Sequence, residues 1–333
     1  MKPIEEVIIK KKTNINTIWL MRQAGRYLPE FRKIRKKNPD FINLCLNEKL
    51  VPQITLQPLK RFDLDAAIIF SDILMIPFAL GQEVTFKKNY GPILGNLNMS
   101  DMEQVNKGDF KKRLRPVYNS MNILSKKLKG KNKSLIGFTG APWTTMVYML
   151  NRKSPKKNLS TDLISNKPLI KKTLKKIIFF TKQHIKNQVD SGATLIQIFD
   201  SWAGLVKSKD LYNLIYNPTL EIVKYVNSLN VPIICFPRNI KNYKEYAKII
   251  KPDAINIDYS VNIKKICNQI EIPIQGGLDP KILLSDRSRL KKETIKILTT
   301  FKDHPYIFNL GHGVLPKTKP SMVDYLVKLV KDY

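Results

Sequence analysis

The sequence predicts an α/β protein with a (β/α)8 TIM barrel fold, and three observations carry that prediction. Its 333 residues are enough for one domain of a large type such as an α/β barrel. Eight short apolar, β-branched runs alternate with helical stretches, which indicates repeated βαβ units. No internal repeat or long linker divides the chain, so we expect a single domain over residues 1–333. An open doubly wound sheet is the alternative, although no G-x-G-x-x-G motif follows the first run.

The eight runs are too continuously apolar for half-exposed antiparallel strands and are typical of buried parallel strands. They cover residues 17–21, 66–70, 135–138, 194–199, 231–236, 254–257, 272–274 and 306–310. Helical spacing of apolar residues predicts helices over 168–190, 210–229, 243–250, 262–270 and 289–301. Pro168 suits a first helical turn, and Gly192 suits the stop after the same helix. Residues 89–107 and 151–167 are predicted as loops.

Charge is the strongest compositional feature, since 58 basic and 27 acidic residues give a formal net charge of +31. Such a field attracts nucleic acid, anionic membranes or a polyanionic small molecule. Most of the basic residues are lysines spread over nearly every polar segment, which indicates a lysine-biased composition. Four arginines, by contrast, crowd into one stretch: Arg22, Arg26, Arg32 and Arg35. Because a guanidinium binds a carboxylate bidentately, this cluster is more informative than the total charge.

Several classes of protein and site are excluded by what the sequence lacks. No window reaches the roughly 18 apolar residues of a membrane span, and residues 1–14 do not resemble a secretory signal. Three scattered cysteines suggest neither a disulfide framework nor a zinc knuckle, so we expect a reducing, cytoplasmic location. No zinc-ligand spacing, phosphate-binding P-loop or G-x-S-x-G nucleophile elbow is present. We therefore expect neither a metal nor a covalent intermediate.

Polar residues and glycines follow each predicted strand, where a barrel places its active site. These segments are 22–26, 71–72, 139–143, 200–204, 237–238, 258–260, 275–279 and 311–313. In a barrel they would all converge at the C-terminal rim. Two arginines, two aspartates and a histidine gathered there favour a site that holds an anionic ligand electrostatically.

Each candidate residue also has a structural interpretation. Arg22 and Arg26 could be surface cations, but Gly25 between them indicates special backbone geometry and favours an anion clamp. Asp72 is either a rim carboxylate or an ordinary N-cap for a helix beginning at Ile73.

The remaining candidates are equally open. Tyr148 is either a core side chain or a ligand contact, and Ser201 is either a helix cap or a ligand contact. His312 lies between two glycines that would let a ligand approach the backbone, which favours a functional role. His184 and His304 are predicted to be solvated.

Six segments resemble uroporphyrinogen decarboxylases. Residues 19–30, WLMRQAGRYLPE, resemble the N-terminal signature of that family, and residues 137–144, GFTGAPWT, resemble its second signature. Further matches are LQP at 56–58, AAIIFSDIL at 66–74, IFDSWAG at 198–204 and NLGHGVLP at 309–316. The resemblance implies a single-domain barrel, usually a homodimer, without metal or cofactor. The implied reaction removes the four acetate carboxyls of uroporphyrinogen III as CO2, giving coproporphyrinogen III in haem and tetrapyrrole biosynthesis.

The resemblance also implies the site. The substrate-binding positions that it implies are Arg22, Arg26, Asp72, Tyr148, Ser201 and His312, with Gln23 and Phe199 lining the cleft and Arg35 reaching in from its edge. Asp72 and Arg22 are the implied catalytic residues. The stretch NRKSPKK at 151–157 departs from the Gly-rich loop that the family commonly carries there, which leaves the local loop shape open.

Two other functions remain as alternatives. A zinc-dependent methyltransferase of a related barrel family would need a His/Cys ligand set, yet Cys235 and Cys267 have no histidine nearby in sequence. A basic nucleic-acid-binding protein would bind with an affinity that falls steeply with salt. We expect the anionic tetrapyrrole as the partner, with no specific nucleic acid and no membrane.

Overall fold

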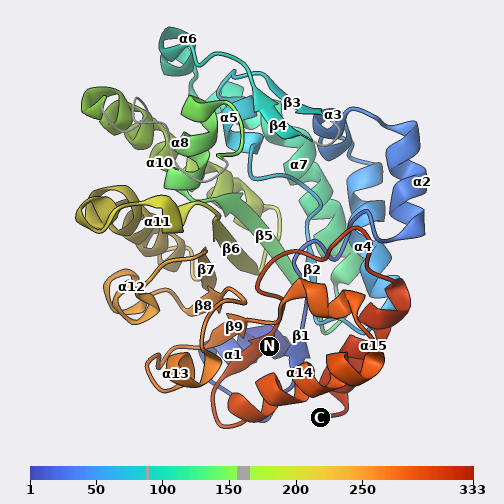
Figure 1. The fold of residues 1–333 in the computed structure, drawn as a ribbon. Helices are drawn as coiled ribbons and strands as arrows, with labels where there is room; N and C mark the ends of the chain where they lie inside the picture. The colour runs from blue at the N-terminus through green and yellow to red at the C-terminus, as the bar shows by residue number, and fades with distance from the viewer. Residues whose placement is uncertain (88–89, 156–165) are drawn as a thin grey trace.

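Eight parallel strands form one sheet that curls into a nearly closed barrel (Figure 1). The computed structural model describes residues 1–87, 90–155 and 166–333. Around the barrel the order is β1-β10-β9-β8-β7-β6-β5-β2. Their bounds are β1 (Thr17–Ile18), β2 (Ala66–Ile68), β5 (Ser134–Gly140), β6 (Leu195–Asp200), β7 (Ile233–Pro237), β8 (Ala254–Ile257), β9 (Ile274–Gly276) and β10 (Tyr306–Phe308). The predicted fold class is confirmed, and every predicted strand is present.

Helices surround the sheet (Figure 1). They are α1 (Pro3–Ile9), α2 (Pro29–Lys37), α3 (Phe41–Cys45), α4 (Leu50–Arg61), α5 (Met75–Ala79), α6 (Met99–Gln104), α7 (Lys107–Leu128), α8 (Pro142–Asn151), α10 (Lys167–Asp190), α11 (Asn217–Asn227), α12 (Tyr243–Ile250), α13 (Ile263–Cys267), α14 (Arg287–Thr300) and α15 (Pro320–Lys331). Pro168 lies in the first turn of α10, and Gly192 follows its end with a φ of +104°, as predicted. Within the described ranges, none of the helices is both long and apolar enough to cross a bilayer.

The prediction of a loop over 89–107 was wrong. β4 (Gly91–Leu94) lies in that segment and pairs antiparallel with β3 (Val84–Lys87), and α6 follows. The sequence of β4, Gly-Pro-Ile-Leu, is too short and too rich in Gly and Pro to indicate a strand, so its pairing partner decides its conformation. Of the other predicted loop, 151–167, residues 156–165 lie outside the described residues.

The barrel interior is filled in layers. Helix α1 packs Ile4, Val7 and Ile8 against inward-facing strand residues. Beyond this apolar layer, the buried Gln275 amide accepts a hydrogen bond from Trp19 Nε1 at 2.8 Å. Its Nε2 atom donates to Asn256 Oδ1 at 2.6 Å. The barrel is therefore a packed core, which leaves only its rim for chemistry.

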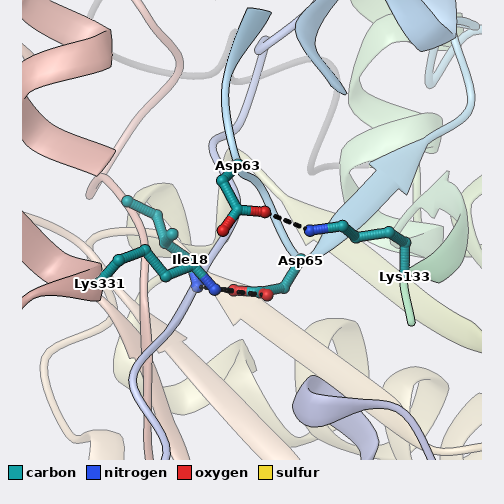
Figure 2. A network of polar contacts seen from close by, with 5 residues as sticks. All are labelled: Ile18, Asp63, Asp65, Lys133 and Lys331. Atoms are coloured by element: carbon teal, nitrogen blue, oxygen red, sulfur yellow. Dashed lines mark hydrogen bonds and ion pairs between the residues drawn. The ribbon is translucent and has the colours of Figure 1, made fainter. Parts of the chain in front are cut away.

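The seam between β1 and β2 is joined largely through side chains. Asp65, just before β2, accepts hydrogen bonds from Ile18 N at 2.7 Å and from Lys331 Nζ at 2.6 and 2.7 Å (Figure 2). Its own N–H donates to Ile18 O at 2.9 Å. Lys331 is the last residue of α15, so the C-terminal helix stabilises the closure of the barrel.

His184 is buried, contrary to the prediction that it is solvated. It is 3% exposed and shares a 3.0 Å hydrogen bond with the Tyr118 hydroxyl of α7, and burial lowers its pKa to about 3. The lysines of α10 lie on one face of the helix, while His184 shares the other face with Ile177 and Ile185. The prediction relied on the lysine-rich composition of the helix and did not separate its two faces. His304 is only half-buried, with Nε2 against Ile272 O at 3.1 Å.

Candidate active site

Arg22 lies in the turn that follows β1, at the C-terminal end of the barrel. Its φ of +60° is in the left-handed region, which costs a non-glycine residue roughly 1 kcal/mol and is typical of functional sites. Its side chain lies across Gly313. A Cβ at that glycine would be 2.6 Å from Arg22 Cγ and closer still to Cδ. Val314 N donates to Met21 O at 2.9 Å and joins the two segments.

This contact revises the interpretation of the glycines beside His312. Gly313 makes room for the Arg22 side chain, and Gly311 makes room for the backbone of Tyr259. Both glycines allow other atoms to come close to the backbone, as predicted, but in this structure those atoms belong to the protein and not to a ligand. The 311–313 segment thus positions an arginine at the rim.

Replacing Gly313 by alanine is expected to lower kcat/KM roughly 10- to 100-fold, because the new methyl group must displace the Arg22 side chain. The Gly313 backbone is not in the left-handed region, so the fold should tolerate alanine. Steady-state kinetics of Gly313→Ala would measure the effect. Gly108→Ala in α7, where a Cβ meets only Asn106 Oδ1 at 3.1 Å, is the matched control. Equal activities of the two variants would contradict the positioning role.

Asp72 follows β2 and lies half-buried at the same end of the barrel. Its Oδ1 accepts a hydrogen bond from Leu74 N at 2.9 Å, the single hydrogen bond to this carboxylate from within the described residues. The next helix, α5, begins at Met75, so Asp72 is not the N-cap of a helix starting at Ile73. Burial raises the pKa of Asp72 to about 6, while the Leu74 N–H and the Arg22 cation lower it.

Tyr148 on α8 and Ser201 after β6 lie on neighbouring parts of the rim. The Tyr148 hydroxyl is 3.3 Å from Ser154 Oγ, and its ring packs edge-on against Trp202 with centroids 5.9 Å apart. Burial raises the pKa of Tyr148, and the Asp72 carboxylate acts in the same direction. Ser201 is half-buried.

A hydrogen-bonded chain fixes the turn that carries Ser201. Trp202 N donates to Thr144 Oγ1 at 3.1 Å, and the Thr144 hydroxyl donates to Asp200 Oδ1 at 2.6 Å. Below this turn Phe199 packs edge-on against Phe138 at 5.6 Å and against Phe236 at 6.4 Å. These three rings form an aromatic layer over the packed barrel interior.

His312 and Arg26 complete the group. Burial, followed by the Arg22 and Arg238 cations, lowers the pKa of His312 to about 4, so its imidazole is neutral at pH 7. Burial also lowers the pKa of Arg22, which Asp72 raises and Arg26 lowers further. Arg22 is thus coupled electrostatically to each of the other four residues. We call these five predicted residues the rim cluster: Arg22, Arg26, Asp72, Tyr148 and His312.

Two further residues predicted to bind substrate, Gln23 and Arg35, make side-chain contacts within the protein. Gln23 is only 1% exposed and bridges the barrel seam, because its Oε1 accepts from Leu20 N at 3.1 Å and its Nε2 donates to Ala66 O at 2.9 Å. This places the Gln23 side chain in the barrel wall, and its contact with substrate stays a prediction. Arg35, on α2, donates to Asn38 O and stacks over Phe41 at 5.5 Å. In the free protein its guanidinium therefore lies at the α2–α3 junction, and its role at the edge of the cleft stays a prediction.

Comparisons with known proteins agree with the signature motifs. The family described as "Uroporphyrinogen decarboxylase (URO-D)" matches residues 1–333. The chain belongs to the uroporphyrinogen decarboxylase family. A uroporphyrinogen decarboxylase from Rickettsia bellii is 40% identical over 331 residues, covering 98% of this chain and 97% of the relative. One from Orientia tsutsugamushi is 39% identical over 341 residues and covers 100% and 99%.

Two solved structures share the fold at low sequence identity. A methyltransferase from Methanosarcina mazei superposes with a TM-score of 0.78 at 16% identity, covering 99% of this chain and 97% of the other. A B12-independent methionine synthase from Shewanella sp. W3-18-1 gives a TM-score of 0.53 at 10% identity, covering 86% and 87%. At such identities the likeness supports the barrel fold alone.

Proposed function

We propose that this chain removes the four acetate carboxyl groups of uroporphyrinogen III as CO2 and releases coproporphyrinogen III. The observation that carries the proposal is the family membership of the whole chain, together with the cluster of Arg22, Arg26, Asp72, Tyr148 and His312 at one end of the barrel. The full-length match and the single eight-stranded sheet support one domain over residues 1–333.

Substrate binding follows from charge. Uroporphyrinogen carries eight carboxylates around a flexible ring of four pyrroles, and guanidinium groups bind carboxylates with two parallel hydrogen bonds. In this proposal Arg26 holds one carboxylate arm. His312, neutral in the free protein, donates one N–H to a second arm, and an incoming anion would raise its pKa.

The chemical step needs an electron sink. Protonation of a pyrrole carbon makes the ring cationic. Loss of CO2 from the adjacent acetate then returns the electron pair of the broken C–C bond to the ring. Protonation of the resulting exocyclic methylene gives the methyl group, and the proton added first is released. In the proposed mechanism the Asp72 carboxylate accepts hydrogen bonds from the pyrrole N–H groups and stabilises the positive charge that develops. Arg22, or a water that it holds, delivers the proton.

Anaerobic incubation with uroporphyrinogen III, followed by chromatography of the products, tests the proposal. We expect successive loss of carboxyl groups that ends at the tetracarboxylate, and activity that survives chelators. An inactive protein that binds oligonucleotides tightly at physiological salt would overturn the proposal in favour of a nucleic-acid-binding protein. Zinc-dependent methyl transfer without decarboxylation would favour a methyltransferase.

Arg26→Lys is expected to raise the KM for uroporphyrinogen III about 10-fold, because a bidentate fork becomes a point charge. Arg26 is exposed, so the fold should be unaffected. Arg115→Lys on the exposed face of α7 provides a control with the same change of residue. Wild-type KM and kcat in Arg26→Lys would remove Arg26 from the proposed site.

We further infer a cytoplasmic homodimer. The family resemblance supports the dimer, and the three free cysteines fit a reducing compartment. Sedimentation equilibrium of the purified chain would test the dimer, and a monomer at micromolar concentration would contradict it.

A further inference from the structure

Arg238 lies in the predicted rim segment 237–238 but was not among the predicted substrate-binding residues. Ile234 and Phe236 of β7 both face the barrel interior, where Phe236 belongs to the aromatic layer. Since side chains alternate along a strand, Arg238 continues on the same side, one step above that layer. In the strand order, β7 lies four positions from β1, so Arg238 faces the segment of Arg22 and Arg26 across the barrel mouth.

The backbone around Arg238 is held in place from several sides. Its N–H donates to Asp200 O at 3.1 Å, and its carbonyl accepts from Gly204 N at 3.1 Å. The next residue, Asn239, has a φ of +60°, and its N–H donates to Asp258 Oδ2 at 2.9 Å. A Cβ at Gly204 would be 2.5 Å from Asn239 O, so a glycine is needed there. The arginine is therefore presented by a rigid turn.

The guanidinium itself has no partner within the described part of the chain. Its Nε is buried without a hydrogen bond, and no carboxylate in that part forms an ion pair with it. Asp258 is engaged elsewhere, because it accepts from Tyr243 Oη at 2.8 Å, from Asn239 N and from Ser260. Asp200 Oδ1 accepts from Thr144, while its Oδ2 is buried without a partner in the described residues and does not pair with Arg238.

Arg238 therefore adds a positive charge without a counter-ion among the described residues to the barrel mouth. Arg238 is close enough to Arg22 and His312 to lower the pKa of both. Buried donors in native proteins normally find acceptors, and like charges without counter-ions destabilise a folded protein. An arginine with a structural role would be paired, whereas one awaiting an anionic ligand would look as Arg238 does.

We propose that Arg238 binds a carboxylate arm of the tetrapyrrole on the side of the barrel mouth opposite Arg26. The proposal rests on the proposed function. Arg26 and Arg238 would bind carboxylate side chains on opposite edges of the tetrapyrrole. The pyrrole N–H groups at its centre would then face Asp72. Arg238 is thus a substrate-binding residue for the same reaction.

Steady-state kinetics under anaerobic conditions, combined with thermal unfolding of the free protein, test this role. Arg238→Gln is expected to raise the KM for uroporphyrinogen III about 10- to 100-fold, the usual range for a lost charge-assisted hydrogen bond, and to change kcat less than about 3-fold. The Tm of the ligand-free variant should equal or exceed that of the wild type, because like-charge repulsion is relieved. Arg238→Lys should give a KM between those of the wild type and Arg238→Gln. The control Arg115→Gln on α7 should leave KM and kcat unchanged.

The outcomes separate the two proposals. An active wild type with an unchanged KM in Arg238→Gln and Arg238→Lys would overturn the role of Arg238 alone. A lowered Tm in both variants, with KM unchanged, would assign Arg238 a structural role instead. A wild type that does not decarboxylate uroporphyrinogen III would overturn the proposed function, and the role of Arg238 with it.

Discussion

Asp72→Asn is expected to lower kcat for uroporphyrinogen decarboxylation by roughly 100-fold or more while leaving the fold intact. The change keeps the size of the side chain but removes the negative charge that would stabilise the cationic ring. Only the Leu74 N–H bond ties this carboxylate to the described part of the protein, and an asparagine Oδ1 can accept the same bond. Asp72→Glu should also have a low kcat, because the extra methylene moves the carboxylate into the space that the tetrapyrrole ring would occupy.

Circular dichroism and denaturant unfolding would check that both variants fold. A purely structural Asp72 predicts a nearly silent Asn variant, because Asn replaces Asp well in local turns. A folded Asp72→Asn protein with wild-type kcat would show that the Asp72 carboxylate does not stabilise the cationic ring.

The raised pKa of Asp72 gives the same prediction a pH dependence. Burial raises this pKa to about 6, so the catalytic anion is lost, and activity falls, as the pH drops through about 6. The effect on stability has the opposite sign. The folded state binds the proton more tightly than the unfolded state, so this group disfavours folding as the pH rises from about 4 to about 6.

His312, with a pKa of about 4, is already largely neutral near pH 6, where Asp72 titrates. Asp200, whose pKa burial raises to about 7, does titrate nearby, so Asp200→Asn is the control. If the acidic limb of the kcat/KM profile vanishes in Asp200→Asn but persists in the residual activity of Asp72→Asn, Asp72 is not the group that titrates.

Asp65→Asn is expected to lower the free energy of unfolding by about 3 kcal/mol, the low end for breaking a buried ion pair. The Asp65 side chain is 4% exposed, whereas its partner Lys331 is 24% exposed. Removing the charge leaves Lys331 without its counter-ion and weakens the acceptor of the Ile18 N–H at the seam. Urea unfolding would measure the change.

Asp63, two residues earlier, offers a matched control (Figure 2). It forms an equally short ion pair with Lys133, at 2.6 Å, but its side chain is 69% exposed. Because exposed pairs contribute only about 0–1 kcal/mol, Asp63→Asn should be nearly neutral. Similar losses of stability in Asp63→Asn and Asp65→Asn would show that burial at the seam is not what makes the Asp65 pair important.

The strands, the main helices and the end of the barrel that carries the site could be predicted from the sequence alone. Local patterns determine these features, because continuous apolar runs such as 254–257 indicate buried strands and residues after parallel strands share one rim. Arg22, Asp72 and His312 were found by that rule. Arg238 obeys it as well, and the signal of a cation directly after β7 was present in the sequence.

Only the tertiary structure decided what each side chain contacts. Gln23 stands next to Arg22 in sequence, yet it closes the seam by binding Leu20 and Ala66, because β1 and β2 meet there. His184 is buried because α10 packs against α7, and Gly313 is needed because Arg22 lies across it. Local sequence determines strand, helix and rim, since these depend on neighbouring residues. Partners distant in the chain determine burial, pairing and pKa, because these properties depend on which atoms folding brings together.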